Sequence, residues 1–364
     1  MPWWALPLTI WSVLTAGSVT LETPDARFGQ RLTWAQVDLE RDLVCGTAPA
    51  CDDVAIKLLA LTSIGQLGTV RAALAPMQFR NSFWILAHYN YWLASGDHAF
   101  LRQHWPALAT SLFAPPADRI IADASIDLAA FEAIVAMARA VNDTATITRV
   151  QALLPAADAR AQESGGIFGA ALGVLNADRA EALVPSIADT VHQQIPLASG
   201  MVALALYKQH QEPAAFRMLQ RMAVQSQSTS AMYVLPLMKG LLGWEVDAPN
   251  RAIGLDPHLP DTWVTLNAIG LVAGRDTISA FLRREQGLYT IQLRRNRSAP
   301  GLSVQLSPAL ARGARVRHIR VNDRDAPLQT DGTRHDTHAI VEFEMRREAV
   351  VEIEYEMPAR RSPR

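Results

Sequence analysis

Residues 82–101 read SFWILAHYNYWLASGDHAFL, and this stretch predicts two helices joined by a tight turn. Asn81 or Ser82 can cap the first helix, along which large apolar side chains follow at helical spacing. Gly96-Asp97 ends that helix, and a second one is expected from His98 to Leu112. Two antiparallel helices joined in this way form an αα-hairpin, which we take as the unit of the fold.

The same pattern extends from Thr23 to about Glu245. Several helices come as pairs with short turns, such as Ala140-Val141-Asn142-Asp143 between helices at 123–141 and 143–153. Further helices are expected at 31–44, 53–64, 176–191, 196–210, 212–224 and 229–242. No fixed-period repeat is visible, so we predict an array of helical hairpins and not an ordinary solenoid.

At Asp247 the composition changes to a β-type pattern. Residues 315–322, 337–343 and 349–355 alternate apolar with polar side chains, as half-buried strands do. An antiparallel β-sandwich of about 100 residues fits this region. The predicted organisation is an apolar N-terminal segment (1–22), a helical domain (23–246), a C-terminal sandwich (247–357) and a tail (358–364).

The charge pattern excludes one class of partner. Lys and Arg total 34 and Asp and Glu 35, giving a net charge of −1. A nucleic-acid partner would require a clustered basic face, so none is predicted. The basic residues at 283–297 and 359–364 are interpreted as a solvated strand face and a frayed tail.

The first 17 residues are apolar, but they are too few for a stable membrane span. They resemble the core of a signal peptide, with Thr15-Ala16-Gly17 near a cleavage point, although no Lys or Arg precedes them. A buried helix or the remnant of an upstream domain is the alternative. The compartment therefore stays open between the cytoplasm and the periplasm or exterior, and the sequence does not fix the oligomeric state.

The two cysteines, Cys45 and Cys51, lie close together in the sequence. They can close a short disulfide loop or remain free thiols. No further Cys or His lies near them at ligand spacing, so no metal site is predicted there. The chain carries no Gly-x-Ser-x-Gly, P-loop or dinucleotide motif, and no cofactor is predicted.

Four stretches, in order along most of the chain, resemble packing and linker motifs of one enzyme superfamily. They are Tyr89–Leu101 with His104–Leu108, Leu235–Gly243 leading into Leu255–Trp263, Leu306–Leu310 with Gly313–Val316, and Leu21–Arg27 with Trp34-Ala35. The chain resembles six-hairpin glycosidases, in particular the bacterial glycogen-debranching, amylo-alpha-1,6-glucosidase-like proteins.

This resemblance implies a reduced (α/α)6 toroid with a pocket at one end. It also implies that the partner is carbohydrate, and that the reaction is hydrolysis of an α-linked or rhamnoside-like glycan. Enzymes of this type use two carboxylates, one as general acid and one as base, which for inversion stand about 6.5–9.5 Å apart.

The chain departs from the family where the chemistry is expected. An aromatic, glycine-rich stretch is missing before Asp53, and residues 78–82 replace a longer acidic loop. Residues 224–229 replace a Glu-bearing loop, and Ile195-Pro196 lacks the family's Trp. We therefore keep two hypotheses, a glycosidase of weak or lost activity and a non-catalytic carbohydrate-binding or scaffold protein. A fragment left by gene deletion is a third.

The candidate site residues follow from the resemblance. We expect Asp127 and Glu132 to be the catalytic residues. Substrate binding is expected from Asp53, Arg80, Trp84, His88, Asp123 and His192. Each has a structural alternative. Asp53, Asp123, Asp127 and Glu132 can be helix caps or exposed residues. Trp84 and His88 can belong to the core, and His192 can lie in a capped loop.

Overall fold

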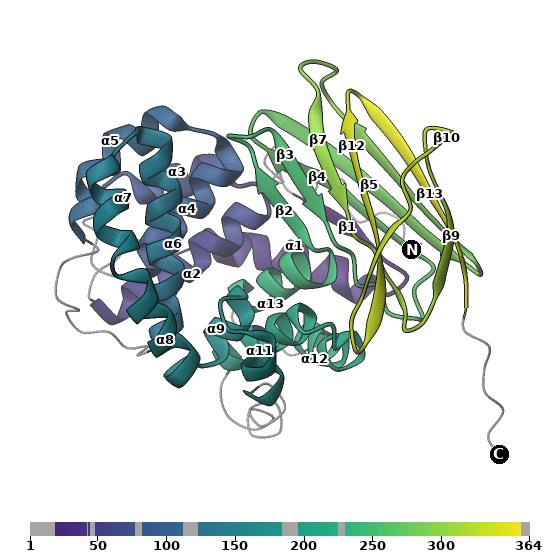
Figure 1. Ribbon diagram of the computed structural model, residues 1–364, viewed down its shortest axis with the longest axis horizontal. Helices are drawn as coiled ribbons and strands as arrows, with labels where there is room; N and C mark the ends of the chain where they lie inside the picture. The colour runs from purple at the N-terminus through teal and green to yellow at the C-terminus, as the bar shows by residue number, and fades with distance from the viewer. Residues whose placement is uncertain are drawn as a thin grey trace, which may run out of the picture.

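The helical region and the β-region lie side by side in the computed structural model (Figure 1). The structure describes residues 19–41, 43, 48–76, 82–111, 123–183, 196–224 and 230–357. The predicted order, a helical hairpin array followed by a β-sandwich, is confirmed.

Helices occupy the chain up to residue 241. Their bounds are α1 (Ala26–Leu39), α2 (Ala48–Ser63), α3 (Leu67–Leu74), α4 (Ser82–Ser95), α5 (His98–Ser111), α6 (Ala124–Val141), α7 (Thr144–Gln151), α8 (Leu154–Ser164), α9 (Ile167–Leu172), α11 (Pro196–Lys208), α12 (Glu212–Val224), α13 (Ser230–Leu235) and the π-helical η2 (Pro236–Leu241). Residues 177–183 are helical as well. The hairpin α4–α5 lies where the opening stretch predicts it. Helix α2 begins earlier than expected, at Ala48, with Pro49 in its first turn, where proline is favoured.

Six of these helices form a closed ring of contacts. In order around the ring, α2 packs on α4, α4 on α6, α6 on α9, α9 on α11, α11 on α13, and α13 on α2. Helices α1, α3, α5, α7, α8 and α12 pack on the outside of this ring. The inner helix α4 is buried along most of its length, as expected for a helix that is apolar on all sides.

Caps and turns fix the hairpins. Asp123 begins α6 by accepting a hydrogen bond from Ser125 N. The helix ends at Asn142, whose left-handed backbone (φ 62°) suits a C-terminal turn. Asp143 then caps α7 and also accepts a hydrogen bond from Trp105 Nε1 at 2.9 Å. The same turn therefore starts a new helix and holds α5 against α6.

Two sheets make up the β-region. The first has the order β1-β4-β5-β6-β13-β9-β10, and the second has the order β11-β12-β7-β3-β2, with β8 paired to β12. The strands are β1 (Thr20–Glu22), β2 (Trp244–Asp247), β3 (Ala252–Leu255), β4 (Thr265–Ala273), β5 (Asp276–Glu285), β6 (Leu288–Arg295), β7 (Leu302–Leu306), β8 (Ala309–Ala311), β9 (Arg315–Val321), β10 (Arg324–Asp325), β11 (Gln329–Gly332), β12 (Asp336–Met345) and β13 (Glu348–Glu356). The pairing is antiparallel except between β3 and β7. Strand β1 precedes the helices in sequence but pairs with β4.

The carboxyl ends of the inner helices face the sandwich. Leu93 O and Ala94 O, at the end of α4, accept hydrogen bonds from Ala248 N at 2.7 Å and Gly274 N at 2.6 Å. Helix α13 continues through η2 into β2, and the turn between them uses Gly243 (φ 61°). A Cβ at Gly243 would stand 2.1 Å from Asp256 O, so the backbones meet there too closely for any side chain.

Among the described helices, none has the length and apolar character needed to span a membrane.

The contact between α11 and α13 closes the ring and provides a test of it. A Cβ on Gly200 would stand 2.3 Å from Met232 O and 2.7 Å from its Cα, both on backbone that cannot rotate away. We expect Gly200→Ala to lower the free energy of unfolding by about 1–3 kcal/mol through overpacking. Denaturant unfolding followed by circular dichroism measures it.

The matched control is Gly68→Ala in α3, where an added Cβ meets nothing within 4 Å. This substitution should be neutral or stabilising by up to about 1 kcal/mol, because alanine loses less backbone entropy in a helix. Equal effects of the two substitutions would contradict the close packing of α11 on α13.

Candidate functional site

Polar side chains gather at the amino-terminal ends of the inner helices. We call this region the polar end of the ring, and its residues are Ser82, Asp123, Ser125, Asp127 and Ser230. Ser82 Oγ, at the start of α4, donates to Asp127 Oδ1 in the first turn of α6 at 2.5 Å. Gly166 N, at the start of α9, donates to Asp123 Oδ1 at 3.2 Å. Three consecutive inner helices therefore begin at the same end of the ring and share hydrogen bonds there.

Asp123 is the most firmly held carboxylate of the polar end. Its Oδ1 also accepts from Ser125 N at 3.0 Å and from the Ser125 hydroxyl. A Cβ on Gly166 would stand 2.9 Å from Asp123 Oδ2, so glycine leaves room for the carboxylate. These donors hold the Asp123 carboxylate in a fixed position.

The remaining predicted carboxylates lie apart from each other. Asp53 lies one turn inside α2, where its carboxylate is 3.4 Å from Lys57 Nζ. It is therefore not the N-cap that the sequence alternative proposed. Glu132 is exposed, on the side of α6 near Asp158 of the neighbouring helix α8. Partial burial and the charge of Asp158 raise the pKa of Glu132.

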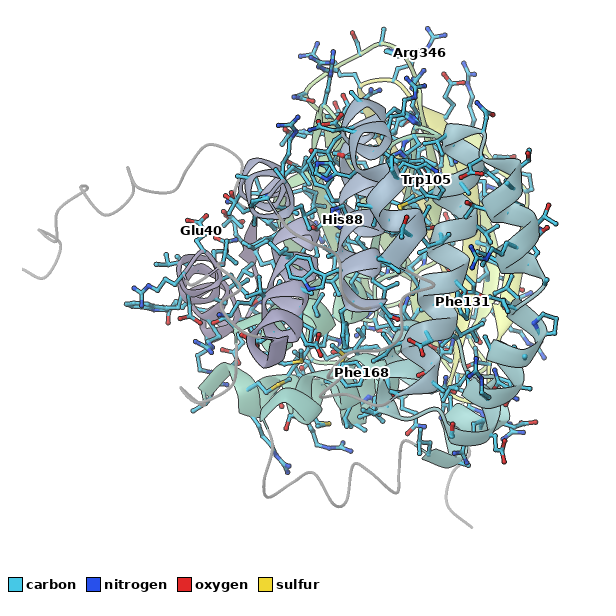
Figure 2. The ribbon with its side chains drawn as sticks, turned by 90° about the vertical axis from the view of Figure 1, so that its left-hand side faces the viewer. Glu40, His88, Trp105, Phe131, Phe168 and Arg346 are labelled. Carbon is cyan, nitrogen blue, oxygen red and sulfur yellow. The ribbon has the colours of Figure 1, made fainter. Side chains whose placement is uncertain are left out.

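Trp84 and His88 are buried side chains of α4, each with 2% of its surface exposed. Figure 2 shows His88 surrounded by helices. Its Nδ1 is 2.9 Å from Trp84 O, and its ring stacks on Phe100. Both residues therefore occupy the position that the core-packing alternative describes. Arg80 and His192 lie outside the described residues.

Burial gives His88 a measurable effect on stability. Burial lowers the pKa of His88 to about 3, with a smaller contribution from His104, while the hydrogen bond to Trp84 O opposes the shift. Arg71 stands over the same Phe100 ring. The folded protein therefore keeps His88 neutral at a pH where the unfolded chain binds a proton.

Stability should consequently fall as the pH drops below about 6.5, by up to about 1.4 kcal/mol per pH unit from this residue. We expect His88→Gln to remove about 2 kcal/mol of the difference in unfolding free energy between pH 7 and pH 5. Urea unfolding at several pH values measures it. His335→Gln is the control, because His335 is exposed and its side chain makes no ion pair among the described residues. This variant should keep the wild-type pH dependence. Identical slopes for His88→Gln and wild type would rule out a buried neutral His88.

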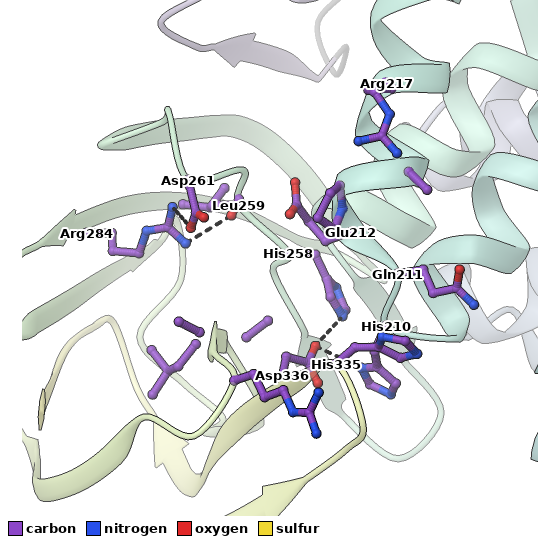
Figure 3. Close-up of a pocket in the computed structure, with 16 residues that line it drawn as sticks. His210, Gln211, Glu212, Arg217, His258, Leu259, Asp261, Arg284, His335 and Asp336 are labelled. Carbon is purple, nitrogen blue, oxygen red and sulfur yellow. Dashed lines mark hydrogen bonds and ion pairs between the residues drawn. The ribbon is translucent and has the colours of Figure 1, made fainter. Parts of the chain in front are cut away.

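A cavity of about 390 Å³ lies where the end of α11 and the start of α12 meet the sandwich (Figure 3). Glu212, Asp261 and Arg284 line one side of it, and His210, His258 and Asp336 line the other. Arg284 donates to the carbonyls of Leu259 and Pro260 at 3.0 and 2.7 Å, which holds its guanidinium in place. Burial raises the pKa of Glu212 to about 7, helped by the charge of Asp261.

On the second side of the cavity, four residues form what we call the histidine–aspartate cluster (His210, His258, Asp336 and His338). His338 Nε2 is 3.0 Å from both His210 Nδ1 and Asp336 Oδ2. His210 Nδ1 is 3.2 Å from the same Asp336 oxygen, and His258 Nε2 is 4.0 Å from it. One ligand atom from each residue fits within 4.8 Å of all the others.

The fold brings these four residues together from three places. His210 lies in the turn after α11, where its backbone is left-handed (φ 58°). His258 follows β3, and its backbone N donates to Leu241 O at the end of η2. Asp336 and His338 lie two apart on β12 and so point to the same face of the strand.

Charges in the cluster are strongly coupled. Burial by itself would lower the pKa of His338, but Asp256 and Asp336 outweigh it and raise that pKa to about 10. Burial would raise the pKa of Asp336, yet hydrogen bonds from His210, His338 and Thr333 hold it well below its ordinary value. Burial lowers the pKa of His258.

None of the cluster residues was predicted to be a site residue from the sequence. His210 and Asp336 are 126 positions apart, and neither belongs to a recognised motif. One sequence feature could have indicated the cluster. Asp336 and His338 are alternate residues at the start of an expected strand, so their carboxylate and imidazole lie on the same face of it.

Comparison with solved structures identifies related folds. An α-L-rhamnosidase from Dictyoglumus thermophilum matches with a TM-score of 0.66 and 9% sequence identity, over 93% of this chain and 50% of that chain. The GH78 family rhamnosidase of Bacillus sp. GL1 matches with a TM-score of 0.55 and 15% identity, over 74% of this chain and 40% of that one. The chain therefore spans half or less of these structures.

No protein-family model matches the sequence, and no curated protein matches it. At such low identities the structural likeness establishes the fold alone, which is the arrangement of helical array and sandwich that these two structures share. Membership of the six-hairpin glycosidases, and of the glycogen-debranching group among them, stays a prediction.

Proposed function

We propose that this chain is a carbohydrate-active protein that hydrolyses an α-linked glycan at the polar end of the helix ring. The observation that carries the proposal is the pair of carboxylates at the start of α6, Asp123 and Asp127, which hydrogen bonds join to the starts of the neighbouring inner helices α9 and α4. This pair occurs in a fold that two rhamnosidases share. Glycoside hydrolysis needs two carboxylates in different states, one protonated and one ionised.

We assign the two carboxylates different roles. Asp123 accepts from two backbone N–H groups and a hydroxyl, which hold its carboxylate in place, and we assign it the role of base or of a group that orients a sugar hydroxyl. Asp127 accepts a hydrogen bond from the Ser82 hydroxyl, and we assign it the general acid because the family resemblance marks it as a catalytic residue. Asp53 is proposed to bind a sugar hydroxyl. Glu132 lies on the outer side of α6, and we assign it no role.

The substrate we propose first is an α-L-rhamnoside. The two structures with the same fold are both named as rhamnosidases, and the sequence resemblance already favoured an α-linked or rhamnoside-like glycan. An α-glucoside is the natural comparison because of the glycogen-debranching resemblance.

Binding without hydrolysis is a second candidate function, and one observation favours it. Asp123 Oδ1 accepts hydrogen bonds at the amino terminus of α6 and from Gly166 N, as a helix-capping residue does. A carboxylate held in this way can orient a sugar without moving a proton. The two functions therefore differ in catalysis and share the binding site.

The test is hydrolysis of aryl α-L-rhamnoside, α-glucoside and α-mannoside by the purified chain. We expect turnover of the rhamnoside that falls about 10²–10⁴-fold in Asp127→Asn, because that variant loses a positioned proton donor. Asp158→Asn is the matched control, since this exposed acid on α8 lies away from the polar end, and its turnover should equal the wild type.

Absence of turnover from folded protein, together with calorimetric binding of rhamnose oligosaccharides that Asp123→Asn abolishes, would select the binding function. Neither turnover nor binding would refute both functions at this site. Turnover that survives in Asp127→Asn would refute the assignment of the general acid.

A further inference from the structure

We propose that the histidine–aspartate cluster binds one Zn²⁺ ion through His210 Nδ1, His258 Nε2, His338 Nε2 and Asp336 Oδ2. Three imidazole nitrogens and one carboxylate oxygen form a ligand set typical of zinc. The site is separate from the polar end of the ring, so this proposal does not depend on whether the chain hydrolyses glycosides.

The spacing of the donor atoms supports a single ion. Bonds of about 2.0–2.1 Å in a tetrahedral site place the ligand atoms about 3.3–3.4 Å apart. Separations of 3.0, 3.0 and 3.2 Å already join His338, His210 and Asp336. His258 Nε2, at 4.0 Å from Asp336 Oδ2, would need to approach that oxygen by roughly 0.6–0.7 Å to reach the tetrahedral spacing.

His258 provides the independent indication of a missing ligand. Its side chain is 5% exposed, and its Nε2 has no hydrogen-bond partner among the described residues. Its Nδ1 is 2.9 Å from Asp256 O, which fixes the tautomer with the proton on Nδ1 and leaves a lone pair on Nε2. An imidazole lone pair buried without a donor is costly, and a metal ion removes that cost.

The groups behind the ligands have the arrangement that metal sites need. His338 Nδ1 is 2.7 Å from Ser307 O, so this ring too is oriented by a backbone carbonyl with Nε2 directed into the cluster. Thr333 Oγ1 donates to Asp336 Oδ1 at 2.5 Å, which leaves Oδ2 for the ion. Outer hydrogen bonds of this kind set tautomer and orientation in zinc sites.

The position of the site suggests what the ion does. His210 belongs to the turn after α11, whereas His258 and β12 belong to the sandwich. A bound ion would therefore cross-link the carboxyl end of the helix ring to both strand segments. His210, His258 and Asp336 also line the cavity, through which the ion can enter.

The experiment measures zinc directly on the whole purified chain. After removal of metal with a chelator and dialysis, we expect Zn²⁺ to rebind at one ion per chain and to raise the melting temperature. Co²⁺ in its place should give the visible absorption bands of a tetrahedral site. Titration against a chromophoric chelator yields the affinity.

The variants are His258→Ala, Asp336→Asn and His210→Ala, each checked for folding by circular dichroism in the metal-free state. Each should lose zinc affinity by about 100-fold or more and lose the zinc-dependent rise in melting temperature. His210 is the most exposed ligand, with 29% of its side chain accessible, so its removal disturbs the core least.

His335→Ala is the matched control, because His335 lines the same cavity but does not belong to the cluster. It should keep the wild-type affinity and the Co²⁺ spectrum. If the wild-type chain binds less than a fifth of an equivalent of zinc, or if the variants bind as tightly as His335→Ala, the proposal is overturned. The cluster is then a hydrogen-bonded network in which Asp256 and Asp336 hold a charged His338.

Discussion

The closure of the ring at the contact between α11 and α13 is the constraint on which the rest of the structure depends. Inner helices such as α4 and α11 are apolar on nearly every side, so each must be covered all round. A closed ring with an outer layer of helices provides that cover. The closure requires glycine at 200, because the backbone of Met232 occupies the space of a side chain.

The two ends of the ring differ in the backbone groups that they present. Amino termini gather at one end, where unpaired backbone N–H groups and the helix dipole favour carboxylates such as Asp123. Carboxyl ends face the sandwich, where carbonyls of α4 accept hydrogen bonds from Ala248 and Gly274. The cavity and the histidine–aspartate cluster lie on this second side, so the polar end and the cluster are distinct sites.

Local signals predicted much of the fold. The apolar run of α4 with Gly96 after it determines a hairpin within a few residues, and alternation determines β9, β12 and β13. Helix α2 was misplaced because Asp53 resembles a cap, whereas Pro49 fits the first turn of a helix that begins earlier. Strand β1 was missed because three residues carry no periodicity, and pairing with β4 alone defines it.

By itself the sequence determined many of the helices and strands, the order of the helical array and the sandwich, and a near balance of acidic and basic residues, since these follow from neighbouring residues or from composition. It also singled out Asp123 and Asp127, which the structure places together at the polar end. Only the tertiary structure decided that His88 is buried and that His210, His258, Asp336 and His338 meet. Periodicity specifies the face on which a side chain lies but not which distant loop that face contacts, because packing between the ring and the sandwich fixes that choice.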